Sequence, residues 1–520
     1  MTGAPRADTI VRPALSRRAF VRRAAMGTAV AGAGLGSLVW DADLAEAAAP
    51  LATKDQDLHL LRRATYGPSK ASLAELKRMG RNAWLERQLR PDSIDDRACD
   101  ELIASRFPRL GWSMDKAWAE LDFGWDLMFD LGVSTVARAA WSERQLFETM
   151  VDFWSNHLNV SNPSDNGWYC RHDYDRTVIR RHAMGKFSDM LLASAEHPAM
   201  MLYLNNAESS KEDPNENYGR ELLELHSVGV DAGYGEDGMW SSTLIMTGFG
   251  IDWDTGHFRY WPDAHHTGPV KVLGFRARNG SARKGRDLGR AYVRYLARHP
   301  ATARRIARKL CLRFVSDAPP PGLVNDLAAT YRRNDTAIVP VLRQLFGSSA
   351  FKDAVGAKIR RPFQDLTATL RILGMGPDAS GTEGLQGLYW MIEGFGDLPL
   401  AWSQPDGYPD YADAWRSAGG TLNRWNMHMS LAAHWWPSSL KLPPLENMLP
   451  RPLPKTHGPL IDALSRRLLF RTMSEAHRDA VLGFLGVGAH TPLSADSEAV
   501  TWRLSSVVAL ILDSPYHQVR

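Results

Sequence analysis

The chain has 520 residues, of which 44% are hydrophobic and 23% are charged, values close to those of ordinary globular proteins. This composition excludes wholesale disorder, a collagen-like repeat and a coiled-coil rod. Lys and Arg number 62 against 58 Asp and Glu, so the formal charge is only +4 and no nucleic-acid partner is expected. The three cysteines, Cys99, Cys170 and Cys311, are too few and too far apart for a disulfide framework or a zinc–cysteine site.

The start of the chain has the three-part pattern of an export signal. Arg17 and Arg18 form a paired-arginine motif, and a Gly- and Ala-rich apolar stretch follows from Ala24 to Trp40. Ala45-Glu46-Ala47 then offers a cleavage site, so residues 1–47 are predicted to be a twin-arginine signal peptide. We therefore expect an exported protein that is periplasmic, cell-wall-associated or extracellular. No later apolar run approaches the roughly 20 residues that cross a bilayer, so we expect no integral membrane segment in the mature chain.

Apolar residues recur at helical spacing through most of the chain from about Asp55. The pattern predicts a mainly α-helical fold: a large multi-helix globular assembly, either one unit or two closely packed halves at 55–318 and 319–520, the second rich in tryptophan. A long helix with a wide apolar face is predicted from Val136 to His157. Helical patterns occupy further segments at 174–205, 215–229, 286–315, 322–333, 337–347, 360–374, 420–434, 458–470, 474–485 and 497–512.

One segment alternates with the period of a β-strand. Ile251–Trp253 and His257–Trp261 are short alternating runs on either side of a turn that contains Gly256. They predict a hairpin, and Val270–Leu273 is a candidate third strand. We therefore expect one small β-hairpin or three-stranded sheet near 250–275.

Several stretches of the chain together match the sequence pattern of a protein family. The longest is the string Asn215–Gly229; the others are Leu60–Pro68, Phe153–His157, His197–Met200, Ala307–Leu310, Pro405–Pro409, Trp415 and Arg424–Asn426. Together they resemble an exported bacterial family catalogued as domain of unknown function 1800. The resemblance implies export, a mostly helical fold and an unassigned activity, with members expected to work beside other exported proteins. The family tends to show His-Asp before a Gly and a Lys, whereas this chain has His265-His266-Thr267-Gly268, so that acidic residue is missing here.

The string Asn215–Gly229 is sharply two-faced when it is drawn as a helix. One arc of about 140° carries polar side chains: Glu216, Asn217, Arg220, Glu221 and Glu224. The opposite side carries apolar ones: Tyr218, Leu222, Leu223 and Leu225. The polar arc is open to three interpretations: a solvated or ion-paired face, a partner-binding face, or a polar site.

If the arc is a site, Glu221, Glu224 and Arg220 are the candidate catalytic residues, because paired carboxylates beside an arginine suit acid–base chemistry. Asn217 and Glu216 are then candidate substrate-binding residues. His226 falls on the apolar side, where a packed, hydrogen-bonded core histidine is the simpler interpretation.

The sequence suggests no cofactor other than a divalent metal. His157 ends the long predicted helix, where a histidine can meet the negative end of the helix dipole. With His265 or His266 and the acidic pair it could complete a mixed histidine–carboxylate site, so His157, His265 and His266 are candidate metal ligands. No HExxH motif and no clustered cysteines support this prediction directly.

Tryptophan is abundant, with 18 residues, and several crowd the C-terminal third. Exposed indole faces stack on sugar rings, which makes Trp415 and Trp425 candidate substrate-binding residues, whereas buried indoles would only fill a large core. The loop from Ser403 to Asp410 has the Pro, Asp and Gly of a tight turn. Its Asp406 and Asp410 could also serve as acids.

Signatures of several enzyme classes are missing: a G-x-S-x-G elbow, a Walker-type phosphate loop, a strand-embedded G-x-G-x-x-G and a C-x-x-C-H haem motif. Two hypotheses remain. The first is an exported carboxylate- or metal-dependent hydrolase or lyase that acts on an envelope or extracellular polymer, such as an envelope polysaccharide. The second is a non-catalytic binding or assembly partner of another exported protein.

Overall fold

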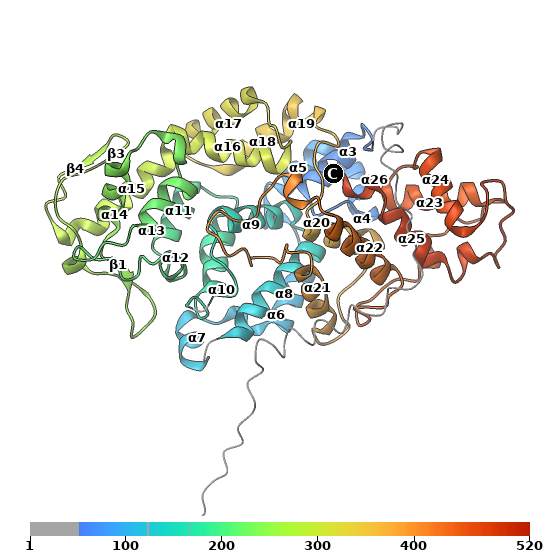
Figure 1. Ribbon diagram of the computed structural model, residues 1–520, viewed down its shortest axis with the longest axis horizontal. Helices are drawn as coiled ribbons and strands as arrows, with labels where there is room; N and C mark the ends of the chain where they lie inside the picture. Colours follow the sequence, from blue (N-terminus) through green and yellow to red (C-terminus); the bar gives the residue numbers. More distant parts are fainter. Residues whose placement is uncertain (1–50, 122–123, 165) are drawn as a thin grey trace, which may run out of the picture. The chain divides into compact units, whose positions relative to one another are not determined.

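The computed structural model describes residues 51–121, 124–164 and 166–520, so the predicted signal peptide at 1–47 lies outside the described residues. The predicted mainly α-helical fold is confirmed, with two small two-stranded sheets inserted between helices (Figure 1). None of the described helices is both long enough and apolar enough to cross a membrane.

The helices before the sheets are α3 Gln56–Ala64, α4 Lys70–Met79, α5 Arg81–Gln88, α6 Arg97–Arg106, α7 Met114–Glu120, α8 Trp125–Trp141, α9 Gln145–His157, α10 Arg171–Tyr174, α11 Phe187–Ala195, α12 Pro198–Tyr203, α13 Glu216–Glu221 and α14 Glu236–Met246. Two π-helical turns, Asp175–Arg180 and Leu222–His226, extend α10 and α13.

The helices after the sheets are α15 Gly285–Arg298, α16 Pro300–Phe314, α17 Pro321–Arg333, α18 Ile338–Gly347, α19 Ser349–Asp353, α20 Pro362–Leu373, α21 Glu383–Glu393, α22 Ala418–Ala432, α23 His457–Leu469, α24 Glu475–Leu485, α25 Leu504–Leu512 and α26 Pro515–Gln518.

The long helix predicted from Val136 to His157 is wrong in one respect, because it is broken at Ser142 into α8 and α9. The buried carboxylate of Asp96 holds the break. It accepts a hydrogen bond from the Ser142 hydroxyl and another from the Glu143 backbone N–H, each 2.7 Å long. The side chain of Asp96, distant in sequence, therefore binds a backbone N–H that a continuous helix would have bonded to its own backbone carbonyl.

Two other predicted helices are divided at a His-Pro pair. The residue before a proline is disfavoured in helical geometry, so α12 and α16 each begin at the proline, Pro198 or Pro300. The preceding histidine caps each new helix, because Nδ1 of His197 and of His299 accepts the backbone N–H two residues on.

The predicted hairpin is confirmed, but the candidate third strand does not extend it. Strand β1 (Phe249–Ile251) pairs antiparallel with β2 (Phe258–Tyr260). Strand β3 (Val270–Val272) pairs instead with β4 (Phe275–Ala277) in a second two-stranded sheet. The side chains of Val270 and Val272 are buried and lie against α14, so β3 serves the core of that region.

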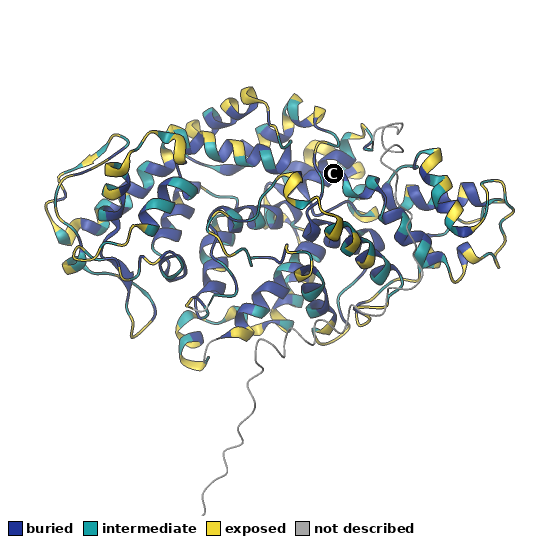
Figure 2. Cartoon of the chain, viewed as in Figure 1, coloured by how far each residue is buried: buried dark blue, intermediate teal, exposed yellow. Residues whose placement is uncertain are grey.

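The buried apolar side chains form two clusters. The first takes its members from residues between Leu60 and Ala354, and so includes α17 and α18. The second runs from Phe363 to Tyr516 and also takes residues of α6 and α8. Most helices therefore show one buried and one exposed face (Figure 2). The division of the chain into halves near 318 stays a prediction.

The three cysteines are buried and none is in a disulfide.

Candidate functional site

The polar helix α13 is anchored at its start and along its apolar face. The side chain of Asn215 caps it by accepting the backbone N–H of Asn217 at 3.0 Å. Gly219 allows a close approach to α14, since a Cβ there would lie 2.6 Å from the hydroxyl oxygen of Thr243. Tyr218, Leu222 and Leu223 are buried, whereas the predicted polar residues are half-buried or exposed. The predicted two-faced character is thus confirmed.

Arg220 organises the charges on the exposed face of α13. Its guanidinium lies 3.2 Å from a carboxylate oxygen of Glu216 and 3.5 Å from one of Glu224. Asn217 donates a hydrogen bond to the side-chain oxygen of Asn205, 3.2 Å away. Two predicted catalytic residues, Arg220 and Glu224, are therefore paired with each other.

Glu221 differs from its neighbours on the helix. Among the described residues, none makes an ion pair or a side-chain hydrogen bond with its carboxylate, which is half-buried. Burial raises the pKa of Glu221, the charge of Glu224 adds to the rise, and Arg220 opposes it. The charge of Asp406 also raises this pKa.

The loop that carries Asp406 is held against α12 and the segment that follows α9. Asn159 donates hydrogen bonds to the backbone carbonyls of Trp402, at 2.9 Å, and Gln404, at 2.6 Å. The hydroxyl of Tyr203 donates to the carbonyl of Ser403 at 2.8 Å. The loop therefore occupies a fixed place beside the C-terminal end of α12.

Two further contacts set the position of Asp406 itself. The indole N–H of Trp402 donates to a carboxylate oxygen of Asp406 at 2.7 Å. Gly407 has φ +73° and passes so close to Asn156 that a Cβ would lie 2.0 Å from its carbonyl oxygen. Burial raises the pKa of Tyr203 to about 12, and the charges of Asp406 and Glu221 add to the rise. Two carboxylates from different elements therefore both act on the pKa of one phenol.

A lysine and two histidines form a second group of contacts, next to the π-helical turn that follows α13. Nζ of Lys309 is 3.1 Å from Nδ1 of His157, and Nε2 of His157 is 3.1 Å from the backbone carbonyl of His226. The carbonyl can only accept, so Nε2 of His157 carries the proton and Nδ1 accepts from Lys309. Burial and the charge of Arg305 lower the pKa of Lys309 from its usual 10.5 to about 7.

His226 lies in the core, as the sequence predicts, but its ring is not hydrogen-bonded within the part of the chain that the structure describes. Its ring is fully buried, and neither ring nitrogen has a hydrogen-bond partner among the described residues. Burial, followed by the charge of Lys309, lowers its pKa to about 3, so the ring is neutral.

A buried ion-pair network supports the far end of the loop. Asp152 on α9 lies 2.7 Å from the guanidinium of Arg313 and 3.4 Å from that of Arg361. Arg313 also lies 3.5 Å from Asp410, the last residue of the loop. Lys358 donates hydrogen bonds to Asp317, at 2.5 Å, and to the backbone carbonyl of Asp410. The sequence analysis missed this network, since only the contacts of the fold reveal it.

The structure does not bring the predicted metal ligands together. His157 lies against Lys309, whereas the ring of His265 lies 2.8 Å from the carbonyl of Thr247 and 3.1 Å from the side-chain oxygen of Asn279. His266 follows it in that region and is half-buried. Within the described residues, the group of histidine and acidic side chains close enough to share a metal ion contains none of the three.

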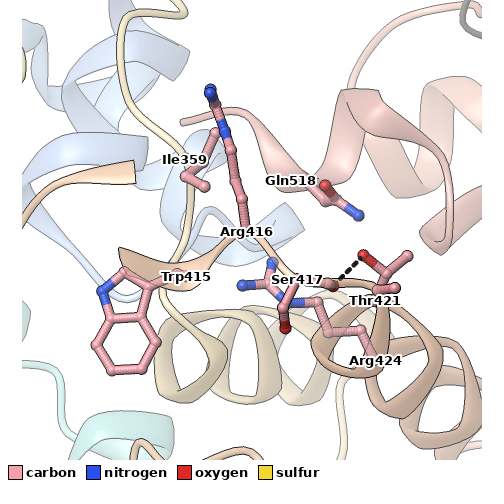
Figure 3. Close-up of a pocket in the computed structure, with 8 residues that line it drawn as sticks. Ile359, Trp415, Arg416, Ser417, Thr421, Arg424 and Gln518 are labelled. Atoms are coloured by element: carbon pink, nitrogen blue, oxygen red, sulfur yellow. Dashed lines mark hydrogen bonds between the residues drawn. The ribbon is translucent and has the colours of Figure 1, made fainter. Parts of the chain in front are cut away.

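One of the two predicted aromatic residues lies beside a cavity of about 290 Å³ (Figure 3). Trp415 lines it, and its indole N–H donates to the carbonyl of Pro409 at 2.9 Å. Trp425 is half-buried on α22, and its indole nitrogen has no hydrogen-bond partner among the described residues. None of the predicted residues of α13 lines this cavity.

The comparison with protein families gives one result. The family described as a protein of unknown function (DUF1800) matches residues 59–519. The chain belongs to this family. No curated protein and no solved structure matches the chain.

The stretches that carry the DUF1800 resemblance meet at the site just described. His157 ends one stretch, α13 and its π-helical turn lie in the long string, and Lys309 and Asp406 belong to two others. Segments far apart in the DUF1800 sequence thus supply one group of interacting charges.

Proposed function

We propose that this DUF1800 protein is an exported hydrolase that acts on an envelope or extracellular polysaccharide with Glu221 as general acid and Asp406 as the second carboxyl group. The observation that carries the proposal is the half-buried, unpaired carboxylate of Glu221, whose charge and that of Asp406 both act on Tyr203, a residue hydrogen-bonded to the loop of Asp406. Glycoside hydrolysis uses two carboxyl groups in unlike environments, one of which stays protonated to release the leaving oxygen.

The environments of the two groups support unlike roles. Burial and neighbouring negative charges raise the pKa of Glu221, so it keeps its proton to a higher pH than a free glutamate. Asp406 accepts the indole N–H of Trp402, which fixes the orientation of the carboxylate. Asn217 and Arg220 lie on the same helical face and can orient sugar hydroxyls.

Export is part of the proposal and rests on the predicted twin-arginine signal. Export is tested by expressing the full-length gene in its native host, isolating the protein from each cell fraction and sequencing its N-terminus. Cleavage after Ala47 and recovery outside the cytoplasm support export, whereas an uncleaved cytoplasmic protein contradicts it.

The catalytic assignment is tested by exchanging one carboxylate for its amide. We expect Glu221→Gln to lower the release of reducing ends from envelope polysaccharides by about a hundredfold or more, because the amide cannot supply the proton. Asp406→Asn is expected to act similarly. Glu212→Gln makes the same exchange on the exposed segment before α13 and is expected to keep full activity.

Normal turnover by a folded Glu221→Gln variant would refute the assignment. If the wild-type protein binds a polysaccharide or an exported protein tightly but releases no reducing ends from any polymer, the non-catalytic alternative gains instead.

A further inference from the structure

We propose that Asp365, His428 and His517 bind one divalent transition-metal ion of the zinc class in the C-terminal part of the chain. The three residues come from α20, α22 and α26, and all are buried, with exposed fractions of 0%, 0% and 2%. One ligand atom from each lies within 4.8 Å of the others. The site is separate from α13 and does not depend on the proposed hydrolase activity.

The distances between the ligand atoms fit a metal centre. A carboxylate oxygen of Asp365 lies 3.0 Å from Nε2 of His517 and 3.5 Å from Nε2 of His428. An ion with metal–ligand bonds of 2.0 to 2.1 Å in tetrahedral geometry separates its ligands by about 3.3 Å. The two observed distances lie on either side of that value, so an ion fits with small side-chain shifts.

Polar atoms at the centre of the cluster lack hydrogen bonds in the described part of the chain. Both carboxylate oxygens of Asp365 and Nε2 of His428 are buried without a hydrogen-bond partner among the described residues. Oδ2 of Asp365 has an ion pair with Arg424, whereas buried polar atoms without partners are costly, and a shared cation satisfies Oδ1 of Asp365 and Nε2 of His428 at once. Two imidazoles and one carboxylate form a donor set that suits zinc or another first-row transition metal rather than calcium or magnesium.

A second carboxylate orients His428 as a ligand. Nδ1 of His428 lies 2.7 Å from a carboxylate oxygen of Asp513, which can only accept a hydrogen bond from a protonated Nδ1. The lone pair of Nε2 is then free to face Asp365. A carboxylate behind a metal-bound histidine commonly fixes the tautomer of the ring and raises its basicity.

The cluster lies one side chain away from the cavity of Figure 3. Arg424 lines the cavity, and its guanidinium is 3.4 Å from the second carboxylate oxygen of Asp365. Gln518, the neighbour of His517 in the chain, lines the cavity as well. Movement of Arg424 thus offers an ion a route to the buried ligands.

A metal-free arrangement competes with the proposal and defines the test. In it, a protonated His428 bridges Asp365 and Asp513, while Thr369 lies 3.1 Å from Nε2 of His517. That arrangement needs no ion, so a direct binding measurement separates the two.

The experiment uses the full chain purified without added metal, stripped with a chelator and titrated with Co²⁺ and then Zn²⁺. We expect one equivalent of Co²⁺ to produce the visible absorption of a tetrahedral histidine-bound ion, and Zn²⁺ to displace it. His428→Gln and His517→Gln are expected to abolish the absorption. His257→Gln removes an exposed histidine that pairs with Asp115 and is expected to leave it unchanged.

Asp513→Asn is the conservative variant that guards against loss of folding. We expect it to keep the fold and to weaken Co²⁺ binding by about tenfold to a hundredfold, because the amide supports His428 less well. A stripped, folded wild-type protein that binds no Co²⁺ would overturn the proposal. Stoichiometric binding that persists in both histidine variants would overturn it too.

Discussion

At the scale of single residues, Lys309 is a group of the candidate site whose charge is sensitive to its surroundings. Its ammonium lies among the buried His157, the nearby charge of Arg305 and the side chains of the loop. Burial and Arg305 lower its pKa from 10.5 to about 7 in the folded protein. Near neutral pH a small change in surroundings therefore changes its charge, a property shared by many catalytic lysines.

Replacing Lys309 by Met is expected to change how stability depends on pH. Between about pH 7 and 10.5 the unfolded lysine holds a proton that the folded one has lost, so the free energy of unfolding of the wild type rises with pH through this window. Below the window the wild type bears the full cost of the buried charge. Lys309→Met should therefore gain most relative to the wild type at the acid end, and the gain should shrink towards pH 10.5.

Urea unfolding of both proteins across that range measures the difference. Lys284→Met, which removes a charge from an exposed position, controls for the general effect of one fewer cation. A difference between Lys309→Met and wild type that stays constant with pH would show that the lysine is not perturbed by burial.

At the scale of helices, the approach of α13 to α14 depends on a missing side chain. A Cβ at Gly219 would lie 2.6 to 2.7 Å from atoms of Thr243, including its backbone. Gly219→Ala should therefore separate the two helices and destabilise the protein by about 1–3 kcal/mol, the usual cost of overpacking. It should also disturb the position of Glu221, two residues along the helix.

A second helical glycine provides the matched comparison. Gly483 lies in α24 with nothing within 4 Å of the position of a Cβ. Gly483→Ala is expected to stabilise the protein by about 0.5–1 kcal/mol, because alanine loses less backbone entropy in a helix. Thermal unfolding of the two variants measures both effects. If both substitutions shift the melting temperature in the same direction, Gly219 is not needed for the close approach of α13 to α14.

The helices were predictable to the extent that their signals are local. Pro321 at the start of α17 and the apolar period of α22 lie within the segments themselves, and both helices form close to their predicted bounds. The break at Ser142 depends on Asp96, which is 46 residues away. The pairing of β3 with β4 likewise depended on a partner strand that the pattern did not distinguish.

The same limit applied to the candidate site. The polar face of α13 follows from helical periodicity, so Asn217, Arg220, Glu221 and Glu224 could be named from the sequence. The contact of Lys309 with His157 joins residues 152 positions apart, and no short motif indicates it. Asp365 and His517 are 152 positions apart as well, so their cluster with His428 was also out of reach.

At the scale of the whole described chain, Asp152 connects the two hydrophobic clusters. It lies on α9, whose apolar face belongs to the first cluster, and contacts Arg361, which precedes α20 of the second. Arg313 from α16 is its closer partner, at 2.7 Å. The three side chains are nearly inaccessible to solvent, so their charges depend on each other rather than on water.

Asp152→Asn should therefore weaken the connection between the clusters. The amide leaves two buried guanidinium groups with less compensation, although Arg313 keeps Asp410 and Arg361 keeps Asp397. We expect a loss of about 3 kcal/mol, the lower end of the range for breaking a buried ion pair. Amide hydrogen exchange should then rise first in α20 and in the loop from Ser403 to Asp410. In the variant, local opening of these two segments no longer has to break the network of ion pairs that joins them to Asp152 on α9.

Asp95→Asn is the control, because its partner Arg97 and the carboxylate are both exposed, and it should change the stability far less. Hydrogen exchange resolved by peptide distinguishes the outcomes. If Asp152→Asn raises exchange uniformly over both clusters, the chain opens as one unit and Asp152 is only one of many contributors. If the increase in exchange is confined to α20 and the loop, the ion pairs of Asp152 are what hold the loop of Asp406 in position. The proposed catalytic pair of Glu221 and Asp406 then depends on charges buried in both clusters.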